Sequence, residues 1–569
     1  MKEDFRKIAP SPLAPQPFDI PQPFETVLAN GLKIVIFENN QLPLVSYRLA
    51  FRSGDINDPK DAIGLTSAMT SLLNEGTTTR SSKQIAEETE RLGAKISAGS
   101  SADYSTVSAS TLSLYKSDVV QLLADITLNP TFPEDEIALF QKNTIQGLES
   151  QRANASFLAN EQVDKILFGE HPYSVVSPSK EDIEKISREN LIAFHQKMFA
   201  PNNAIFIIVG DVNRAELLQE IEDNFGDWKQ KDIESVEFSA LPNRTTTTLT
   251  VVDRPGSAQS NIVLANLAID RTSPDYFPVL LMNQVLGAGA SSRLFMNLRE
   301  EKGYTYGAYS RLDTRRLAGS FEATAEVRTS VTGDALHEFF YELNRIRDEK
   351  VTEKELNDAK NFLTGIFPLR AETQEGLTNL IVSQKLYDLP EDYLQTYRDK
   401  VNAVTLDEVE QMAKKYITPD KIAVVIVGDA EEILPQIKSY SDNIEVFDTE
   451  GNAVDIAKYG QAESVETANA AGKWALNIDF QGQTVPVKLE LKQDGAKVTG
   501  VLESMLGAGE IADGKVNGNK FVGAAKTQIQ GQDVELVINA TIDGDSMEGV
   551  VDARMPGFPP LSFTGMKAQ

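Results

Sequence analysis

Hydrophobic and polar positions alternate over residues 25–55, and Asn30-Gly31 interrupts this alternation with a strong hairpin-turn signal. Residues 64–73 are instead apolar at helical spacing. Ser81-Ser82 and Gly93 are typical of the start and the end of a second helix. The pattern then predicts strands near 95–112 and at 204–211, and helices at 115–127, 133–152, 184–199 and 215–225.

The second half of the chain repeats elements of the first half. The strand IFIIVGD at 205–211 returns as AVVIVGD at 423–429, and FPEDEI at 132–137 returns as VTEKEL at 351–356. These offsets of 218 and 219 residues are nearly equal, which indicates an internal duplication. Each copy is too large for a solenoid repeat. We therefore predict two homologous domains, at residues 25–235 and 236–445.

The remaining segments differ from the duplicated region in composition and in hydrophobic pattern. Residues 1–24 contain six prolines and predict an extended arm, and residues 446–470 are small, polar and acidic, as in a linker. Residues 471–569 form short alternating runs separated by turns, which predicts an all-β sandwich or barrel. The expected fold class is α+β: two domains, each with a mostly antiparallel sheet covered by helices, followed by the β domain.

Composition narrows the possible partners and surroundings. The net charge of −28 argues against a nucleic-acid partner, and no apolar run reaches the roughly 18 residues of a membrane span. The absence of cysteine excludes disulfides and thiolate metal sites. The polar, proline-rich start resembles the mature end of an exported protein. We therefore expect a periplasmic or otherwise exported location, with the cytoplasm as the alternative.

The strongest candidate for chemistry is LGAGASSRLFMNLREEKGYTYGAYS at 286–310. Arg299 offers a permanent cation and Tyr306 a phenolic donor, and together they could hold a carbonyl oxygen or a carboxylate. Gly303 predicts a helix end near Lys302 and a strand start near Tyr304. The alternative is a polar helix face with core tyrosines. Further candidates for substrate binding, through backbone or hydroxyl groups, are Gly287, Gly289, Ser291 and Ser292.

Histidine is too sparse for a familiar helical zinc motif. The three histidines are His171, His195 and His337, and no two lie within 20 residues of each other. A pair at i and i+4 on one helix is therefore excluded. His171 precedes a proline after an apolar helix, where a structural role is the default.

The chain resembles the pitrilysin/insulinase-type inverzincin metallopeptidases, in particular half-size members similar to mitochondrial processing peptidase. The resemblance covers roughly residues 25–440. It rests on the following segments: NGLKIVIFEN at 30–39, GLTSAMTSLLNEGTTTRS at 64–81, LFGEHPYS at 167–174, the two VGD strands and the stretch at 286–310.

The resemblance implies that the zinc motif of the family is degraded here. That motif is H-x-x-E-H, and Gly64-Leu65 and Gly76-Thr77 frame a stretch of matching length. Ser67, Thr70 and Ser71 stand at the three motif positions, and Glu149 is the candidate for the later carboxylate ligand. Neutral hydroxyls are poor zinc ligands, and Thr70 cannot serve as the water-activating base. We expect no metal in this chain.

The resemblance also implies that Arg299 and Tyr306 match the family's Arg/Tyr pair, which binds the substrate carbonyl and stabilises the tetrahedral intermediate. We therefore expect a non-zinc subunit of a heterodimeric zinc metalloendopeptidase. It would be inactive alone and would act on unfolded peptides with a homologous, zinc-bearing partner. The alternative is a catalytically inactive peptide-binding or structural subunit of a larger complex. Autonomous zinc peptidase activity is disfavoured by the degraded motif.

Overall fold

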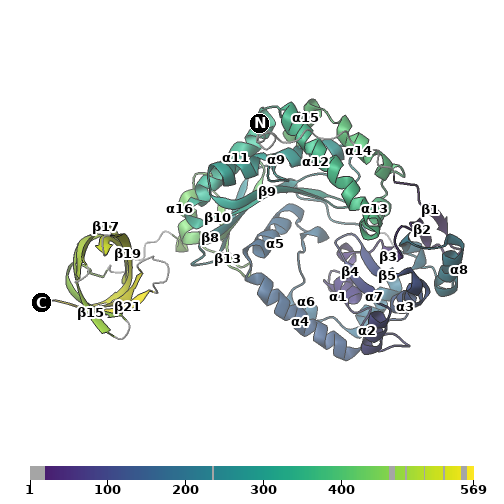
Figure 1. The fold of residues 1–569 in the computed structure, drawn as a ribbon, viewed down its shortest axis with the longest axis horizontal. Helices are drawn as coiled ribbons and strands as arrows, with labels where there is room; N and C mark the ends of the chain where they lie inside the picture. The colour runs from purple at the N-terminus through teal and green to yellow at the C-terminus, as the bar shows by residue number, and fades with distance from the viewer. Residues whose placement is uncertain are drawn as a thin grey trace, which may run out of the picture. The chain divides into compact units, whose positions relative to one another are not determined.

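The computed structural model describes residues 20–233, 236–441, 443–459, 468–480, 483–504, 507–529, 532–552 and 560–568. The chain folds into two compact units, residues 1–456 and 457–569 (Figure 1). The first unit contains two mixed sheets with their helices, and the second is a β-barrel. The predicted α+β class is confirmed.

The first sheet has six strands in the order β1-β2-β6-β3-β5-β4. Its strands are β1 (Phe24–Val27), β2 (Lys33–Glu38), β3 (Leu44–Phe51), β4 (Lys95–Ser100), β5 (Ser105–Leu112) and β6 (Ala204–Gly210). The associated helices are α1 (Leu65–Ser71), α2 (Ser82–Arg91), α3 (Lys116–Leu128), α4 (Glu134–Arg152), α5 (Ala155–Phe168), α6 (Lys180–Glu184), α7 (Arg188–Met198) and α8 (Arg214–Phe225). Strand β6, one of the two repeated VGD strands, is buried along its whole length.

The second sheet has seven strands in the order β13-β12-β7-β11-β8-β10-β9. Its strands are β7 (Thr248–Asp253), β8 (Gln259–Leu267), β9 (Thr305–Thr314), β10 (Gly319–Arg328), β11 (Ala423–Gly428), β12 (Ile444–Phe447) and β13 (Ala453–Val454). The associated helices are α9 (Tyr276–Leu286), α10 (Arg293–Phe295), a π-helix (Met296–Glu301), α11 (Thr332–Asp348), α12 (Glu353–Glu372), α13 (Gln374–Leu386), α14 (Tyr393–Ala403), α15 (Leu406–Tyr416) and α16 (Ala430–Ile437). None of the helices in the described residues has the length and hydrophobicity that crossing a membrane requires.

Five strands of each sheet share one topology. In the first, β6 pairs in parallel with β2 and antiparallel with β3, and in the second β11 pairs in parallel with β7 and antiparallel with β8. Beyond these strands, β5 and β4 in the first sheet correspond to β10 and β9 in the second. The VGD repeats thus fall on the equivalent strands β6 and β11, and the repeats at 132–137 and 351–356 lead into the helices α4 and α12. Strand β9, which carries Tyr306, is an edge strand.

One helix from each half of the first unit packs on the sheet of the other half. Helix α5 packs on β8 and β11 of the second sheet, whereas α13 packs on β3 and β6 of the first. Leu158 and Val163 of α5 share one buried cluster with Val263 and Val425 of the second sheet. Figure 1 shows α5 on the side of the second sheet opposite to α9, α11, α12 and α15. Because of this exchange, the two domains share their cores.

A hairpin tip adds polar contacts between the two halves. The tip joins β9 to β10, and its Arg315 pairs with Asp164 of α5 at 3.3 Å. The neighbouring Arg316 donates its backbone N–H to Asp103 at 2.8 Å. Asp103 also accepts hydrogen bonds from the hydroxyls of Tyr173 and Tyr387. A buried carboxylate that has several donors holds its neighbours in place.

Three predicted boundaries differ from the structure. The helix expected at 184–199 starts at Arg188, because the Ser187 side chain caps it by accepting the backbone N–H of Asn190. Residues 446–454 of the expected linker instead contribute to β12 and β13, and Val446 is only 3% exposed. The expected arm 1–24 reaches into β1, and its residues 1–19 lie outside the described part.

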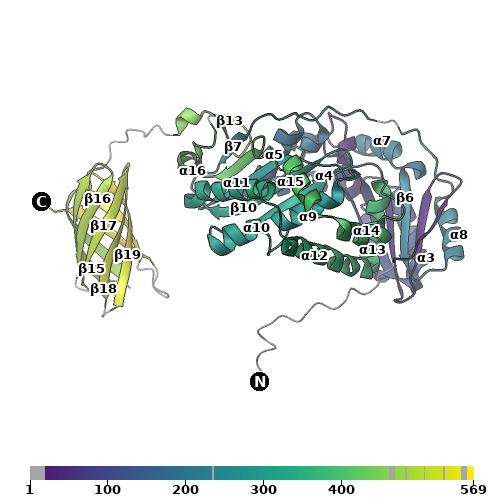
Figure 2. The same ribbon diagram turned by 90° about the horizontal axis from the view of Figure 1, so that it is seen from above.

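The second unit is a closed barrel of eight antiparallel strands, which decides between the sandwich and barrel alternatives. The strands are β14 (Gly472–Phe480), β15 (Gln483–Asp494), β16 (Lys497–Ser504), β17 (Gly507–Asn517), β18 (Lys520–Ile529), β19 (Gln532–Asp543), β20 (Ser546–Asp552) and β21 (Leu561–Lys567). Each strand pairs with the next, and β14 pairs with β21 to close the barrel. Figure 2 shows the barrel from the side. Trp474, Phe521 and Phe563 belong to its apolar interior.

Candidate functional site

The stretch at 286–310 forms a helix end followed by the edge strand β9. The π-helix ends at Glu301, Gly303 adopts φ +64°, and β9 begins at Thr305. This confirms the break predicted from Gly303, since glycine adopts a positive φ without strain. The π-helix inserts an extra residue into the turn that carries Arg299, a distortion often found at functional sites.

Arg299 presents its side chain to solvent from a buried support. Its guanidinium carbon lies 4.8 Å from the centre of the Phe295 ring, and Phe295 is only 5% exposed. The Arg299 side chain is 45% exposed, and its Nε lies 3.4 Å from Glu300 Oε1. Such an exposed pair contributes at most about 1 kcal/mol. A ligand carbonyl or carboxylate can therefore compete for the guanidinium.

Tyr306 is the most exposed large hydrophobic side chain of this stretch, at 88%. Within the described residues its hydroxyl makes no hydrogen bond, so the phenol is free to donate to a ligand. The alternative that these tyrosines are core residues is wrong for Tyr306. Tyr309, by contrast, packs against Phe295 with ring centres 5.6 Å apart.

Two polar contacts, one partly buried and one buried, anchor the segment that carries Arg299. Arg293 makes a two-point pair with Glu355 at the start of α12, with Nε–Oε1 at 2.7 Å and Nη2–Oε2 at 3.1 Å. Asn297 donates from Nδ2 to Glu338 and Glu342 of α11 at 3.0 and 2.9 Å. The two contacts fix α10 and the π-helix against longer helices, as a preorganised site requires.

The ion pair with Arg293 also lowers the pKa of the Glu355 carboxylate. Burial alone would raise the pKa of Glu355, but hydrogen bonds from Arg293 and Thr352 outweigh burial and lower that pKa from 4.5 to about 2. Glu355 therefore stays ionised at neutral pH, and the ion pair persists.

The glycine and serine residues before this segment differ in burial and in backbone contacts. Gly287 donates its N–H to the Asn283 carbonyl at 2.9 Å and accepts from the Ser310 N–H at 2.8 Å, so both of its backbone groups are engaged. Ser292 is buried, at 2% exposure. The Gly287 backbone is therefore engaged within the fold, and the substrate contacts of Gly287 and Ser292 stay predictions. Gly289 is half-buried and Ser291 is exposed, and their contacts with substrate stay predictions.

Helix α1 carries the residues that stand at the zinc-motif positions. Thr70 is fully buried, and its hydroxyl donates to the carbonyls of Thr66 and Ser67, each at 3.0 Å. Ser67 and Ser71 are exposed hydroxyls. These side chains do not fit a zinc ion, because they offer neither an imidazole nor a carboxylate.

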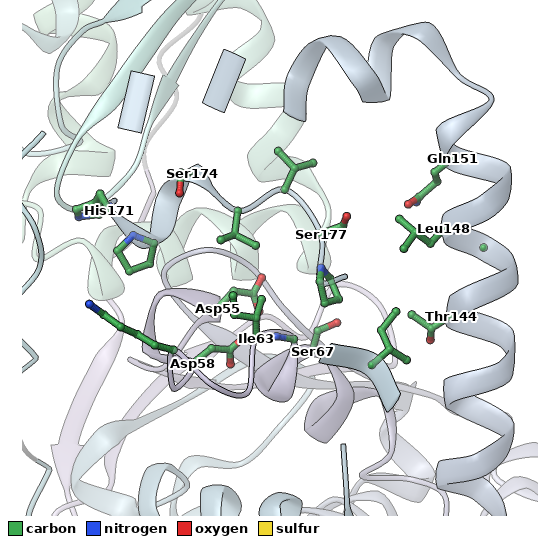
Figure 3. Close-up of a pocket in the computed structure, with 18 of the residues that line it drawn as sticks. Asp55, Asp58, Ile63, Ser67, Thr144, Leu148, Gln151, His171, Ser174 and Ser177 are labelled. Atoms are coloured by element: carbon green, nitrogen blue, oxygen red, sulfur yellow. Dashed lines mark hydrogen bonds between the residues drawn. The ribbon is translucent and has the colours of Figure 1, made fainter. Parts of the chain in front are cut away.

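The position on α4 that faces α1 is occupied by Leu148 and not by Glu149. A cavity of about 620 Å³ is lined by Ser67 and by Thr144, Leu148 and Gln151 of α4. Figure 3 shows these three side chains projecting from one face of α4 into the cavity. Glu149 is exposed and does not line the cavity, because it lies one residue, or about 100°, further around the helix. Leu148 is therefore better placed than Glu149 for the ligand position, and the assignment of Glu149 stays a prediction.

The same cavity contains residues that sequence reasoning missed. Asp55 and Asp58 line it near the start of α1, and the loop after α5 adds Glu170 and His171. His171 is buried, and its Nδ1 accepts the backbone N–H of Tyr173 at 3.2 Å, as expected of a structural histidine. Burial lowers its pKa and favours the neutral ring. The described residues contain no cluster of three or more His, Asp or Glu side chains that could hold a metal.

The cavity and the Arg/Tyr pair do not form one site within this chain. Every residue that lines the cavity lies between Asp55 and Ile183, in the first half of the duplicated region. Arg299 and Tyr306 belong to the second half and are absent from the lining. The two features are therefore described separately.

Comparisons with known proteins identify the relatives of the chain. Residues 33–176 match the family described as insulinase (peptidase family M16), and residues 185–363 match the peptidase M16 inactive domain. Together these matches cover more than half of the sequence.

Individual relatives and a solved structure point to the same family. A Bacillus subtilis protein named uncharacterized zinc protease YmxG is 21% identical over 70% of this chain and 96% of its own length. A Helicobacter pylori protein named non-peptidase homolog YmxG is 23% identical over 70% and 92%. The crystal structure of a peptidase M16 inactive domain from Pseudomonas fluorescens is 29% identical, with a TM-score of 0.67 over 72% of this chain and 98% of that one. The chain belongs to the M16 (insulinase) peptidase family.

Proposed function

We propose that this chain is the non-zinc subunit of a heterodimeric M16 peptidase and supplies Arg299 and Tyr306 to an active site completed by a partner. The proposal rests on a contrast between the two halves of the duplicated region. The second half presents an exposed cation and a free phenol on an anchored support. The first half has hydroxyls and a leucine where zinc ligands would be needed.

The proposed role of the pair is to bind the carbonyl of the scissile bond. A guanidinium and a phenol directed at one oxygen stabilise negative charge that develops there, and removal of one such donor costs a factor of about 10² to 10³ in turnover. Zinc, held by the partner, would supply the activated water. Strand β9 lies at the edge of its sheet, where an extended peptide can add, although the Gly307 backbone beside Tyr306 is already bonded to the Thr305 hydroxyl.

The test combines this chain with a homologous chain that carries H-x-x-E-H and measures cleavage of an unfolded peptide. We expect cleavage only by the mixture, and a loss of about a hundredfold or more for Arg299→Ala and for Tyr306→Phe. Unchanged turnover in both variants would refute the proposed roles. The control is Arg311→Ala on β9, whose guanidinium pairs with Glu322.

A second candidate function is peptide binding or structural support without catalysis. It is favoured by the matches to the M16 inactive domain and to a relative named a non-peptidase homolog. This function predicts that the mixture with an H-x-x-E-H chain cleaves no faster than that chain alone. The same assay therefore distinguishes the two candidates.

A further inference from the structure

Helix α12 carries an apolar row on its exposed surface. Phe362 and Leu369 are 49% and 66% exposed, and Ile366 lies half-buried between them. Their spacing of four and three residues places these side chains on one face of the helix, and we call the three residues the α12 stripe. Leu363 and Phe367 point elsewhere and are buried. The core therefore does not use the stripe, which is accessible to a further partner.

The stripe is specific to the second half of the duplicated region. Helix α4 is the counterpart of α12, at the offset of 219 residues that relates the segments 132–137 and 351–356. The same offset places three polar or small residues of α4 at the stripe positions, namely Asn143, Gly147 and Ser150. The duplicated fold therefore does not require large apolar side chains at these positions.

The segment that precedes Ile20 starts beside this helix. Ile20 is buried, and its carbonyl accepts a hydrogen bond from Gln395 Nε2 of α14 at 3.0 Å. Helix α14 packs directly on α12, with the rings of Tyr397 and Phe367 stacked 4.3 Å apart. Figure 2 shows α14 beside α12. Residues 1–19 are therefore attached next to the helix that carries the stripe.

Residues 1–19 are long enough to reach the stripe. Crossing from α14 to the far side of α12 takes about 20–25 Å, because packed helix axes lie about 8–10 Å apart and a helix is about 10–12 Å wide. A proline-rich segment in the polyproline II conformation rises about 3.1 Å per residue, so roughly eight residues cover this distance. The prolines between Pro10 and Pro17 suit this span, and the residues before them can contact α12.

Two large apolar residues of the arm match the stripe in spacing. Phe5 and Ile8 are three residues apart, which corresponds to about 9 Å in an extended chain. Phe362 and Leu369 are seven residues apart on a helix, which corresponds to about 10 Å. Phe5 and Ile8 can therefore cover both ends of the stripe at once.

The charges beside these apolar residues are also complementary. Arg6 and Lys7 lie between Phe5 and Ile8 in the arm. On α12, Asp358 lies one turn before Phe362, and its ion pair with Lys354 is exposed at both side chains. Such an exposed pair is weak, so Asp358 can also attract a basic residue of the arm.

We propose that the N-terminal arm docks on α12 of the same chain, with Phe5 and Ile8 packed on the α12 stripe. The prolines that follow span the distance between the stripe and Ile20. The contact removes the apolar surface of the stripe from water, which supplies its driving force. It needs neither zinc nor a partner chain, so it is independent of the proposed function.

The absence of cysteine makes this contact testable with a single introduced disulfide. The full chain receives Ala9→Cys in the arm and Gly365→Cys beside the stripe, and mass spectrometry follows disulfide formation under mild oxidation. A Cβ at Gly365 meets no atom within 4 Å, so this substitution leaves α12 intact. We expect a disulfide within one chain. Phe5→Ser or Leu369→Ser in this background should slow its formation about tenfold, because each removes a large apolar contact.

Two matched variants distinguish docking from random encounters of a tethered segment. Phe18→Ser removes the same ring from the spanning part of the arm, and Leu139→Ser removes a leucine of α4 that is 51% exposed. Neither should change the rate of disulfide formation. Equal rates for Phe5→Ser and Phe18→Ser, or for Leu369→Ser and Leu139→Ser, would overturn the proposal. A disulfide found only between two chains, or none at all, would overturn it as well.

Discussion

The guanidinium of Arg299 lies over the ring of Phe295, four residues earlier on the same helical segment. Phe295 is buried and contacts Tyr309 of β9, so the cation rests on a ring that is itself held by the edge strand. The Arg299 side chain is therefore exposed to solvent and yet supported from below. This relationship links the packing of the motif to its availability for a ligand.

Gly287 should be intolerant of any side chain, whereas Gly289 should accept one. A Cβ at Gly287 would lie 2.4 Å from the backbone nitrogen of Ser310, but at Gly289 its nearest neighbour is the flexible Gln284 side-chain amide at 3.2 Å. We expect Gly287→Ala to lower the free energy of unfolding by about 1–3 kcal/mol and Gly289→Ala to change it little. Urea denaturation of both variants checks this. Equal stability of the two variants would contradict the structural role of Gly287.

Arg293 should matter for stability far more than Arg299 does. Arg293 is 7% exposed and pairs with Glu355 at two points. Arg293→Met leaves that carboxylate without its main donor, and we expect a loss of about 2–3 kcal/mol, because Glu355 keeps some access to solvent. Arg299→Met is the matched control and should stay within about 0.5 kcal/mol of the parent. Guanidinium denaturation measures both variants.

The ion pair between Arg293 and Glu355 should also make the free energy of unfolding depend on pH. The pKa of Glu355 is about 2 in the folded chain, below its ordinary value of 4.5. The folded state therefore binds this proton less readily than the unfolded state, and the stabilisation is present above about pH 4.5 and lost as pH falls toward 2. We expect Glu355→Gln to be less stable than the parent by roughly 1–2 kcal/mol at neutral pH. That difference should shrink across the acid range.

A control for this titration lies in the same helical turn. Glu353 is exposed at the start of α12, and Glu353→Gln removes one negative charge without touching Arg293. It should be close to the parent in stability at neutral pH. A gap between Glu355→Gln and the parent that stays constant from neutral pH down to pH 2 would refute the ionised pair.

Zinc binding should be absent in the parent chain and recoverable by substitution. Ser67 and Leu148 line the same cavity, and Ser71 lies one helical turn after Ser67. We expect Ser67→His, Ser71→His and Leu148→Glu, combined in one chain, to bind zinc stoichiometrically by metal analysis after dialysis. The same two histidines with glutamate left only at position 149 should bind much more weakly. Equal binding by both chains would contradict the placement of Leu148.

Much of the fold could be predicted because it depends on local patterns. The repeated VGD strands, the break at Gly303 and the turns at Gly495, Gly518 and Gly544 are encoded in short stretches, and each appears in the structure. The exchange of α5 and α13 could not be predicted, since either helix could have covered its own sheet. The periodicity of a helix shows which face is apolar but not which sheet it meets.

The site was predictable only in part for the same reason. Arg299 and Tyr306 lie close in sequence, so their spacing is visible there. The choice between Leu148 and Glu149 depends on which face of α4 is turned toward α1. Neighbouring residues on a helix point about 100° apart, so an error of one residue selects the wrong face. The cavity combines three distant segments, and Gly287 is constrained by Ser310 across the fold. Such contacts between distant segments leave no local signal.

The central claim is that Arg299 and Tyr306 act on a substrate that a zinc-bearing partner cleaves. The most direct measurement is the turnover of an unfolded peptide by the purified complex of this chain with an H-x-x-E-H partner, at saturating substrate. The account predicts a fall of about a hundredfold or more for Arg299→Ala and for Tyr306→Phe, with complex formation and unfolding free energy unchanged. Full turnover by both variants in an intact complex would contradict it.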